Sequence, residues 1–327
     1  MISVEHLIKY YGDHLAVDDI SFRISEGHVY GFLGPNGAGK STTMNIITGC
    51  LSPTSGKVTI DGYDIFESPN EAKKRIGYLP EHPPLYMNET PWDYLRFVAE
   101  AKGLRGAAVN EQVQQAVEKT GIDHVKHRRI RTLSKGYKQR VGIAQALLGS
   151  PKVIILDEPT VGLDPIQIIE IRELIRQLGK THTVIFSSHI LSEVQSVCDT
   201  VLMITKGKLV AFGTPEELQN KLLTSHEITL TTDAPADQLD SIFTGINSIS
   251  DLQVSEKDGR TLVTVKSEAS DIYALSSDIF RAFSAKGFVL YETVLKKGNL
   301  EDIFVELSES ASASPSNETK ESEDTQK

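Results

Sequence analysis

The chain has 327 residues, 39% of them hydrophobic and 24% charged, which is ordinary for a globular protein large enough for more than one domain. Its 34 basic and 44 acidic residues give a net charge of −10, which argues against nucleic acid as the main partner. A basic, apolar leader is absent at the start, and no apolar run approaches the roughly 18 residues of a spanning helix, so we expect a cytoplasmic protein. Cys50 and Cys198 stand outside any metal or redox spacing and are expected to be reduced thiols.

In chain order, the first predicted elements are antiparallel strands around a Gly-Asp turn, within residues 3–27. Short apolar runs then alternate with helical patterns, which is typical of a mainly parallel sheet covered by helices. The predicted strands are 28–34, 153–159 and 182–189, the predicted helices are 41–49 and 166–178, and a hairpin is predicted over 201–213. The mostly helical stretch at about 90–149 is interpreted as an insert on this α/β core.

The pattern changes after Gly213. Thr214-Pro215-Glu216-Glu217 is a capping-box start with proline at the first helical position, and this helix is predicted to close a first domain, 1–223. Strand 227–232, helix 236–244, strands 248–255 and 261–266, helix 271–286, strand 288–294 and helix 299–307 follow. This βαββαβ order predicts a small α+β, ferredoxin-like domain over 224–307. The acidic, serine-rich tail 308–327 lacks large apolar residues and is predicted to be disordered.

A glycine-rich segment fits the pattern G-x-x-x-x-G-K-[ST] between a predicted strand and a predicted helix. Its residues are Gly34, Pro35, Asn36, Gly37, Ala38, Gly39, Lys40 and Ser41. Such a loop curls its backbone N–H groups toward phosphate oxygens, and the helix N-terminus adds partial positive charge. We expect Lys40 to reach the β- and γ-phosphates of ATP and the Ser41 hydroxyl to bind Mg²⁺, and we include Thr42 among the nucleotide-binding residues. The alternative is a turn that binds nothing, which the strand–loop–helix context disfavours.

A second element follows the predicted strand of VIILDEP, where open α/β sheets bind ligands. Asp157 at the strand's end is expected to hold Mg²⁺ through water. Glu158 is expected to polarise the water that attacks the γ-phosphate. An Asp-Glu pair at a strand end is a weak signal alone, and the phosphate loop makes it a strong one.

A third element is LSKGYKQRVGIAQAL, residues 133–147, in which Ser134 is placed as an N-cap and Gly136 lets the backbone approach an anion. Taken alone, it is also an ordinary capped helix. Here the chain resembles the ATP-binding cassette family, whose signature is usually L-S-G-G-Q. Gly162-Leu163-Asp164 is similar to the family's subunit-contact loop, and His189 is similar to its switch histidine. A lone histidine at a strand end is otherwise structural.

The resemblance covers residues 1–220 and implies a P-loop NTPase cassette that forms a head-to-tail dimer, with itself or with a paralogous cassette subunit. In such a dimer the signature of one subunit completes the ATP site of the other. Tyr11 resembles the aromatic that stacks on adenine, the alternative being a core or edge tyrosine. Glu81 stands where the family usually has a glutamine that faces the metal, and Lys135 and Tyr137 stand where glycine and glutamine are usual in the signature. We count Glu81 as a metal-ligand candidate that brings an extra negative charge.

The chain is similar to ATPase subunits of bacterial exporters whose membrane permease is a separate polypeptide, and the gliding-motility-associated and multidrug or polysaccharide export branches look most similar. This resemblance implies a peripheral location on the inner face of the cell membrane. Residues 81–97 are predicted to contact the permease through exposed aromatics at Tyr86, Trp92, Tyr94 and Phe97, the alternative being that Trp92 and Phe97 belong to the core of the insert.

Two other function classes are weighed against transport. DNA-repair cassette ATPases carry long coiled-coil or zinc-bearing insertions, whereas the interval between Ser41 and Leu133 has no sustained heptad repeat. Translation-associated cassette proteins usually carry two cassettes and a basic linker, whereas this acidic chain has a single phosphate loop. Both observations favour the transporter subunit.

Overall fold

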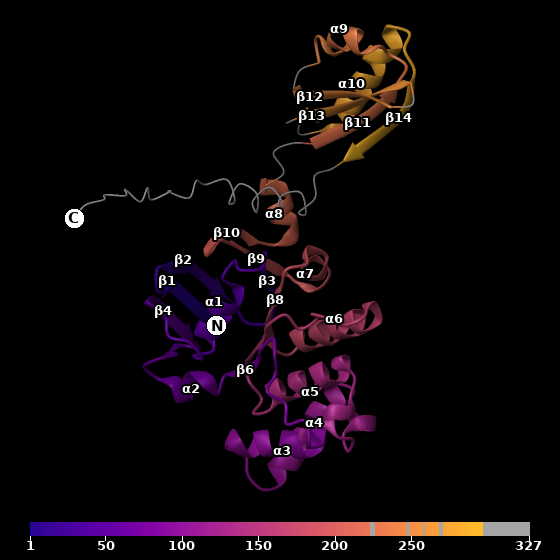
Figure 1. Cartoon of the computed structure of the whole chain (residues 1–327). Helices are drawn as coiled ribbons and strands as arrows, with labels where there is room; N and C mark the ends of the chain where they lie inside the picture. Colours follow the sequence, from indigo (N-terminus) through magenta and orange to yellow (C-terminus); the bar gives the residue numbers. More distant parts are fainter. Residues whose placement is uncertain (223–225, 247–248, 258, 268–270, 297–327) are drawn as a thin grey trace, which may run out of the picture. The chain divides into compact units, whose positions relative to one another are not determined.

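The computed structural model describes residues 1–222, 226–246, 249–257, 259–267 and 271–296 (Figure 1). The chain forms two compact units, one containing Met1–Pro215 and the other Glu216–Glu306. The division falls at the start of helix α8 (Pro215–Leu222), whereas the sequence pattern placed the boundary after that helix. Within the described residues, no helix combines the length and the apolar character that crossing a membrane requires.

An antiparallel sheet near the N-terminus has the strand order β2-β1-β4-β5. Its strands are β1 (Ile2–Tyr11), β2 (His14–Ile24), β4 (Ser55–Ile60) and β5 (Tyr63–Asp64). The tight connection between β1 and β2 is made by Gly12 and Asp13, and Gly12 has φ +56, a left-handed conformation that suits glycine. The predicted antiparallel strands around a Gly-Asp turn are therefore present.

The second sheet is mainly parallel, with the order β10-β9-β3-β8-β7-β6. Its strands are β3 (Val29–Leu33), β6 (Ile76–Leu79), β7 (Val153–Leu156), β8 (Thr183–Ser188), β9 (Thr200–Thr205) and β10 (Lys208–Gly213). Every residue of β3, β7 and β8 is buried, as expected for parallel strands covered on both faces. Only β10 pairs antiparallel, through the predicted hairpin with β9.

Helix α1 (Lys40–Ile47) lies between the two sheets, and Met44, Ile46 and Ile47 belong to one hydrophobic core with residues of both. Helices α6 (Pro165–Gly179) and α7 (Leu191–Val197) flank the parallel sheet (Figure 1). Each of them contacts both β3 and β8, and the two helices also contact one another. The loop before α1 is thereby held at the carboxyl end of β3. The predicted fold class, a mainly parallel sheet with N-terminal antiparallel strands and a helical insert, is confirmed.

The segment between β6 and β7 is helical, as predicted for the insert. After the short α2 (Pro69–Lys73), which precedes β6, the chain forms α3 (Pro91–Ala101), α4 (Ala107–Lys119), the 3₁₀ turns Asp123–Val125 and Ile130–Thr132, and α5 (Lys135–Leu147). Helix α5 packs directly on β6, because Gly77 has no side chain to hold off the carbonyl of Ala146.

The aromatic residues of 81–97 do not all lie at the surface. Tyr86 and Phe97 are 49% and 52% exposed, and their ring centroids are 5.4 Å apart. Tyr94 is 3% exposed and donates its hydroxyl to Gln145 of α5, so the expectation that it is exposed was wrong. Its burial raises its pKa to about 12.

Trp92 is half-buried, with Lys126 over its ring. Helical periodicity explains the difference, because Tyr94 and Leu95 share the inner face of α3 and Phe97 lies outside it.

The second unit is a four-stranded antiparallel sheet of order β12-β13-β11-β14 with helices on one face (Figure 1). Its elements are β11 (His226–Thr232), the 3₁₀ turn Ala236–Gln238, α9 (Leu239–Phe243), β12 (Ile249–Lys257), β13 (Arg260–Ser267), α10 (Ile272–Ala285) and β14 (Leu290–Lys296). Ile228, Leu230, Val263, Ile279 and Phe283 form the centre of its core. This is the βαββαβ order of a ferredoxin-like unit. The predicted helix 299–307 and tail 308–327 lie outside the described residues.

Candidate functional site

The loop between β3 and α1 is built from glycines that other backbone groups approach closely. Gly37 and Gly39 have φ +79 and +101, which L side chains rarely adopt. A side chain on Gly34 would collide with the carbonyl of Ile204, and one on Gly39 with that of Ala16. Because α1 begins at Lys40, directly after this loop, its N-terminus faces the space that the loop encloses.

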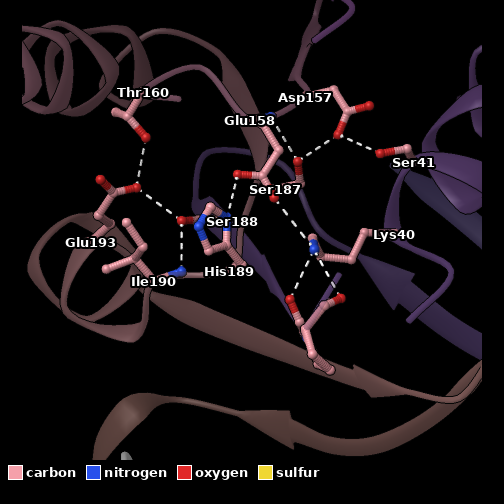
Figure 2. Close-up of polar contacts among 12 residues, drawn as sticks. Lys40, Ser41, Asp157, Glu158, Thr160, Ser187, Ser188, His189, Ile190 and Glu193 are labelled. Atoms are coloured by element: carbon pink, nitrogen blue, oxygen red, sulfur yellow. Dashed lines mark hydrogen bonds and ion pairs between the residues drawn. The ribbon is translucent and has the colours of Figure 1, made fainter. Parts of the chain in front are cut away.

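Lys40 is held inside this loop. Its Nζ donates to the carbonyl oxygens of Gly34, at 2.8 Å, and Pro35, at 3.2 Å. The same amine lies 3.3 Å from Glu158 Oε1, and both side chains are buried, Lys40 being 5% exposed (Figure 2). A buried charge needs a partner of opposite charge, and Lys40 and Glu158 are such partners for one another.

Asp157 lies at the end of β7 and is the acceptor for two hydroxyl groups. Ser187 Oγ donates to Asp157 Oδ1 at 2.6 Å and Ser41 Oγ donates to the same atom at 3.2 Å (Figure 2). Burial raises the pKa of Asp157, and the charge of Glu81 acts in the same direction, while the two hydrogen bonds oppose them. The hydroxyl of Ser41 and the carboxylates of Asp157 and Glu81 are hard oxygen donors, the kind that Mg²⁺ prefers, so these residues fit the predicted ion.

Glu158 and His189 come from neighbouring strands and meet in front of the loop. His189 Nδ1 lies 3.0 Å from Glu158 Oε2, and the backbone N–H of Glu158 donates to Ser187 Oγ at 2.8 Å. Glu158 has φ +46, a left-handed conformation that is unusual for a residue with a side chain. Strain of this kind gathers at functional sites, where the surrounding contacts hold it.

One cleft of about 460 Å³ collects most of the predicted site residues. It is lined by Tyr11, His14, Ala16, Asn36, Gly37, Gly39, Lys40, Ser41, Thr42, Glu81, Glu158, Val161 and His189. Gly34, Pro35 and Ala38 shape the loop behind it, and Asp157 lies beneath it, bonded to Ser41.

Two polar residues of this region, His14 and Ser187, were not predicted from the sequence, and neither were the apolar lining residues Ala16 and Val161. His14 lines the cleft beside Tyr11, and Ser187 joins Asp157 to the backbone of Glu158. The nearness of His14 to Tyr11 in sequence was a usable signal, whereas nothing in the sequence distinguishes Ser187 from any serine at a strand end.

The signature residues Ser134 and Gly136 lie in a different hollow, of about 260 Å³, between the N-terminal ends of α5 and α6. Ser134 caps α5 by accepting the N–H of Tyr137 at 3.4 Å. The side chain of Gln167 lies against Gly136, and Lys135 extends over Gly162, so α5 and the loop before α6 are in direct contact. Within one chain, then, the signature and the phosphate loop do not share a cavity.

Comparison with known proteins gives a consistent result. A family model described as "ABC transporter" matches residues 17–161. The chain is 39% identical over 225 residues to the uncharacterized ABC transporter ATP-binding protein YxlF of Bacillus subtilis, covering 69% of this chain and 75% of that protein. It is 41% identical over 212 residues to the bacitracin transport ATP-binding protein BcrA of Bacillus licheniformis, covering 64% and 68%. Among solved structures, cbiO1 of Clostridium perfringens, part of the ABC transporter complex cbiONQ, aligns with a TM-score of 0.62 and 32% identity, over 67% of this chain and 90% of that one.

Proposed function

The chain belongs to the family of ABC transporter ATP-binding subunits, which are ATPases, and from that premise we propose that it powers export through a separate membrane permease. The single observation that carries the proposal is the cleft in which Lys40, Ser41, Glu158 and His189 converge. A phosphate loop, a buried acidic pair and a histidine in one cleft are the parts that ATP hydrolysis requires. Transport is supported by relatives such as the bacitracin transport protein, and export is the direction that we propose.

The proposed chemistry assigns a role to each cleft residue. The loop 34–42 binds the phosphates through its backbone N–H groups, and Lys40 exchanges its contact with Glu158 for the β- and γ-phosphates. Glu158 then accepts a proton from the attacking water, and His189 orients Glu158 through the 3.0 Å contact. Tyr11 stacks on the adenine.

Ser41, Asp157 and Glu81 would hold Mg²⁺. When bound, that ion neutralises charge on the β- and γ-phosphates. The shared hydrogen bond between Ser41 and Asp157 supports this assignment, because it brings a hydroxyl and a carboxylate to one point beside the phosphate loop.

The separation of the two hollows supports a dimer. Ser134 and Gly136 sit at the N-terminus of α5, where N–H groups and the helix dipole favour an anion, yet they lie outside the cleft of their own chain. A second cassette, identical or paralogous, that is arranged head to tail would bring this terminus to the γ-phosphate across the interface.

The permease contact is proposed at the exposed aromatic pair Tyr86 and Phe97. These rings are in contact, with their planes tilted by 35°, and remain about half exposed. Aromatic side chains bury much area at low entropic cost. Tyr86 follows the cleft residue Glu81 by five positions in the chain, so a short segment would connect a partner docked there to the cleft. Such docking would keep the chain on the inner face of the cell membrane.

The test is to purify the tagged full chain from cells in which it is native, after mild detergent extraction. We expect an integral membrane polypeptide in stoichiometric amount, and ATP hydrolysis that rises when that polypeptide is reconstituted with the chain in vesicles. Recovery with ribosomes or DNA, and no membrane polypeptide, would support the translation-associated or DNA-repair alternatives and contradict the proposal.

A further inference from the structure

A buried carboxylate lies behind the histidine of the cleft. Glu193, in the first turn of α7, is 1% exposed, and its Oε2 atom accepts hydrogen bonds from two hydroxyl groups (Figure 2). Thr160 Oγ1 donates at 2.7 Å and Ser188 Oγ at 2.8 Å. Thr160 belongs to the segment after β7 and Ser188 ends β8, so one oxygen atom joins the two segments that carry Glu158 and His189.

The direction of each hydrogen bond follows from its chemistry. An ionised carboxylate only accepts, and a backbone N–H only donates. The N–H of Ile190 donates to Ser188 Oγ at 3.0 Å, so the Ser188 hydroxyl accepts from Ile190 and donates to Glu193. Because Ser188 and Ile190 flank His189, this chain of bonds fixes the backbone on both sides of the histidine ring.

The charge of Glu193 is balanced by Arg172 of α6, whose Nη2 lies 3.5 Å from Oε1. Across the part of the chain that the structure describes, Arg172 Nε and Glu193 Oε1 are the buried side-chain nitrogen and oxygen atoms without a hydrogen-bond partner. A buried ion pair of this kind gives little net stability, and well-packed apolar side chains commonly serve as well or better. What an apolar residue could not supply here is the acceptor for the two hydroxyl groups.

We infer that Glu193 is a positioning residue, which holds Glu158 and His189 at hydrogen-bonding distance across the cleft. The inference rests on the roles proposed above for those two residues. Thr160 is two positions after Glu158, and Ser188 is one position before His189, so Oε2 of Glu193 is hydrogen-bonded to a residue near each partner of their 3.0 Å contact. The left-handed backbone of Glu158, at φ +46, needs such support from its surroundings.

The test measures ATP hydrolysis and nucleotide affinity of the full chain carrying Glu193→Ala. We expect the Kd for ATP to stay within about twofold of the wild type and kcat to fall about tenfold or more, because a displacement of about 1 Å at a reacting pair can cost about 100-fold. Glu193→Gln keeps an acceptor oxygen for both hydroxyl groups and is expected to retain most of the activity. Glu173→Ala, which removes an exposed glutamate of α6, is the matched control and should leave kcat unchanged.

A double-mutant cycle separates positioning from general weakening of the fold. In a His189→Ala background, Glu193→Ala should lower kcat by less than about twofold, since the pair that it positions is already broken. The inference would be overturned if the losses of kcat caused by His189→Ala and Glu193→Ala multiplied in the double variant. It would also be overturned if Glu193→Gln and Glu193→Ala lowered kcat equally. If Glu193→Ala does not fold, Thr160→Val and Ser188→Ala each remove one donor while keeping the buried ion pair, and unchanged kcat in both would overturn it.

The same set of variants distinguishes a failure of this inference from a failure of the proposed function on which it rests. Normal hydrolysis by Glu158→Gln and His189→Ala would contradict the proposed catalytic roles. Inactive Glu158→Gln and His189→Ala beside fully active Glu193→Ala, Thr160→Val and Ser188→Ala would contradict the role of Glu193 alone.

Discussion

Lys40 and Glu158 form a buried ion pair, and the proposed binding of ATP would give Lys40 a new partner. Lys40 Nζ already has two carbonyl oxygens and a carboxylate around it, at 2.8 to 3.3 Å. A phosphate that enters the loop competes with Glu158 for the amine and leaves that carboxylate available to water. If Lys40 and Glu158 have the proposed roles, this contact would couple phosphate binding to release of the base.

At this scale we predict that Glu158→Gln abolishes hydrolysis but not binding. The amide is nearly the same size but cannot accept a proton from water, so kcat should fall by about 10²–10⁴, the usual contribution of a general base. The Kd for ATP should be equal or lower, because the amide competes less with phosphate for Lys40. Phosphate release and isothermal titration calorimetry measure the two quantities.

The paired change Lys40→Ala should act in the opposite way, weakening ATP binding itself. Lys119→Ala, which removes an exposed lysine of α4, serves as the control for loss of one positive charge. A Glu158→Gln protein that hydrolyses ATP at the wild-type rate would show that another residue is the base.

Most residues of the cleft could be predicted because they belong to short motifs of neighbouring residues in the sequence. Lys40 and Ser41 stand within a spaced glycine motif, and Asp157 and Glu158 follow an apolar run. Ser187 and Glu193 belong to no such motif, and their importance depends on strands and helices that folding brings together. A serine and a glutamate are otherwise ordinary at those positions.

Among the elements, strands β3, β7 and β8 and the hairpin β9–β10 were predicted, whereas the edge strand β6 was not, and the short helices were predicted less well. Strands β3, β7 and β8 are buried on both faces, so their apolar runs are unbroken. The helix predicted over 236–244 is instead a 3₁₀ turn, Ala236–Gln238, followed by α9, Leu239–Phe243. Thr244, at φ −59 and ψ 119, has already left the helical conformation, and the buried side chains of Leu239 and Phe243 decide the position of the short helix more than helix propensity does.

The exposed aromatic pair Tyr86 and Phe97 supports a prediction about the permease contact. Tyr86→Ala combined with Phe97→Ala should abolish co-purification of the membrane partner and should change ATP hydrolysis by the isolated chain by less than about twofold. Phe66→Ala removes another exposed aromatic of the same unit and is the control. Pull-down from detergent extracts measures partner binding. Retention of the partner by the double variant would mean that the contact lies elsewhere.

For the whole molecule, the two hollows predict an ATP-dependent dimer. The Glu158→Gln chain should double in mass when MgATP is added, and Ser134→Arg in the same background should prevent this by placing bulk at the terminus of α5. Light scattering coupled to gel filtration measures the mass. Thr90→Ala removes a similar helix cap from α3, worth about 1 kcal/mol, and controls for loss of helix stability. A dimer that forms equally well with Ser134→Arg would contradict the head-to-tail arrangement.

The close approach of α5 to β6 has a mechanical consequence. Gly77 lets the backbone of β6 lie against the carbonyl of Ala146 in α5, and the side chain of Leu79 from β6 fits over Gly142 of the helix, so the two elements interlock at two points. We therefore expect the strand and the helix to tilt together as one rigid lever. Its two arms lead to Glu81 and to Ser134, and α5, with 13 residues at about 1.5 Å each, is about 20 Å long. A rotation of about 3° would carry Ser134 through about 1 Å, enough to make or break a hydrogen bond in a neighbouring subunit.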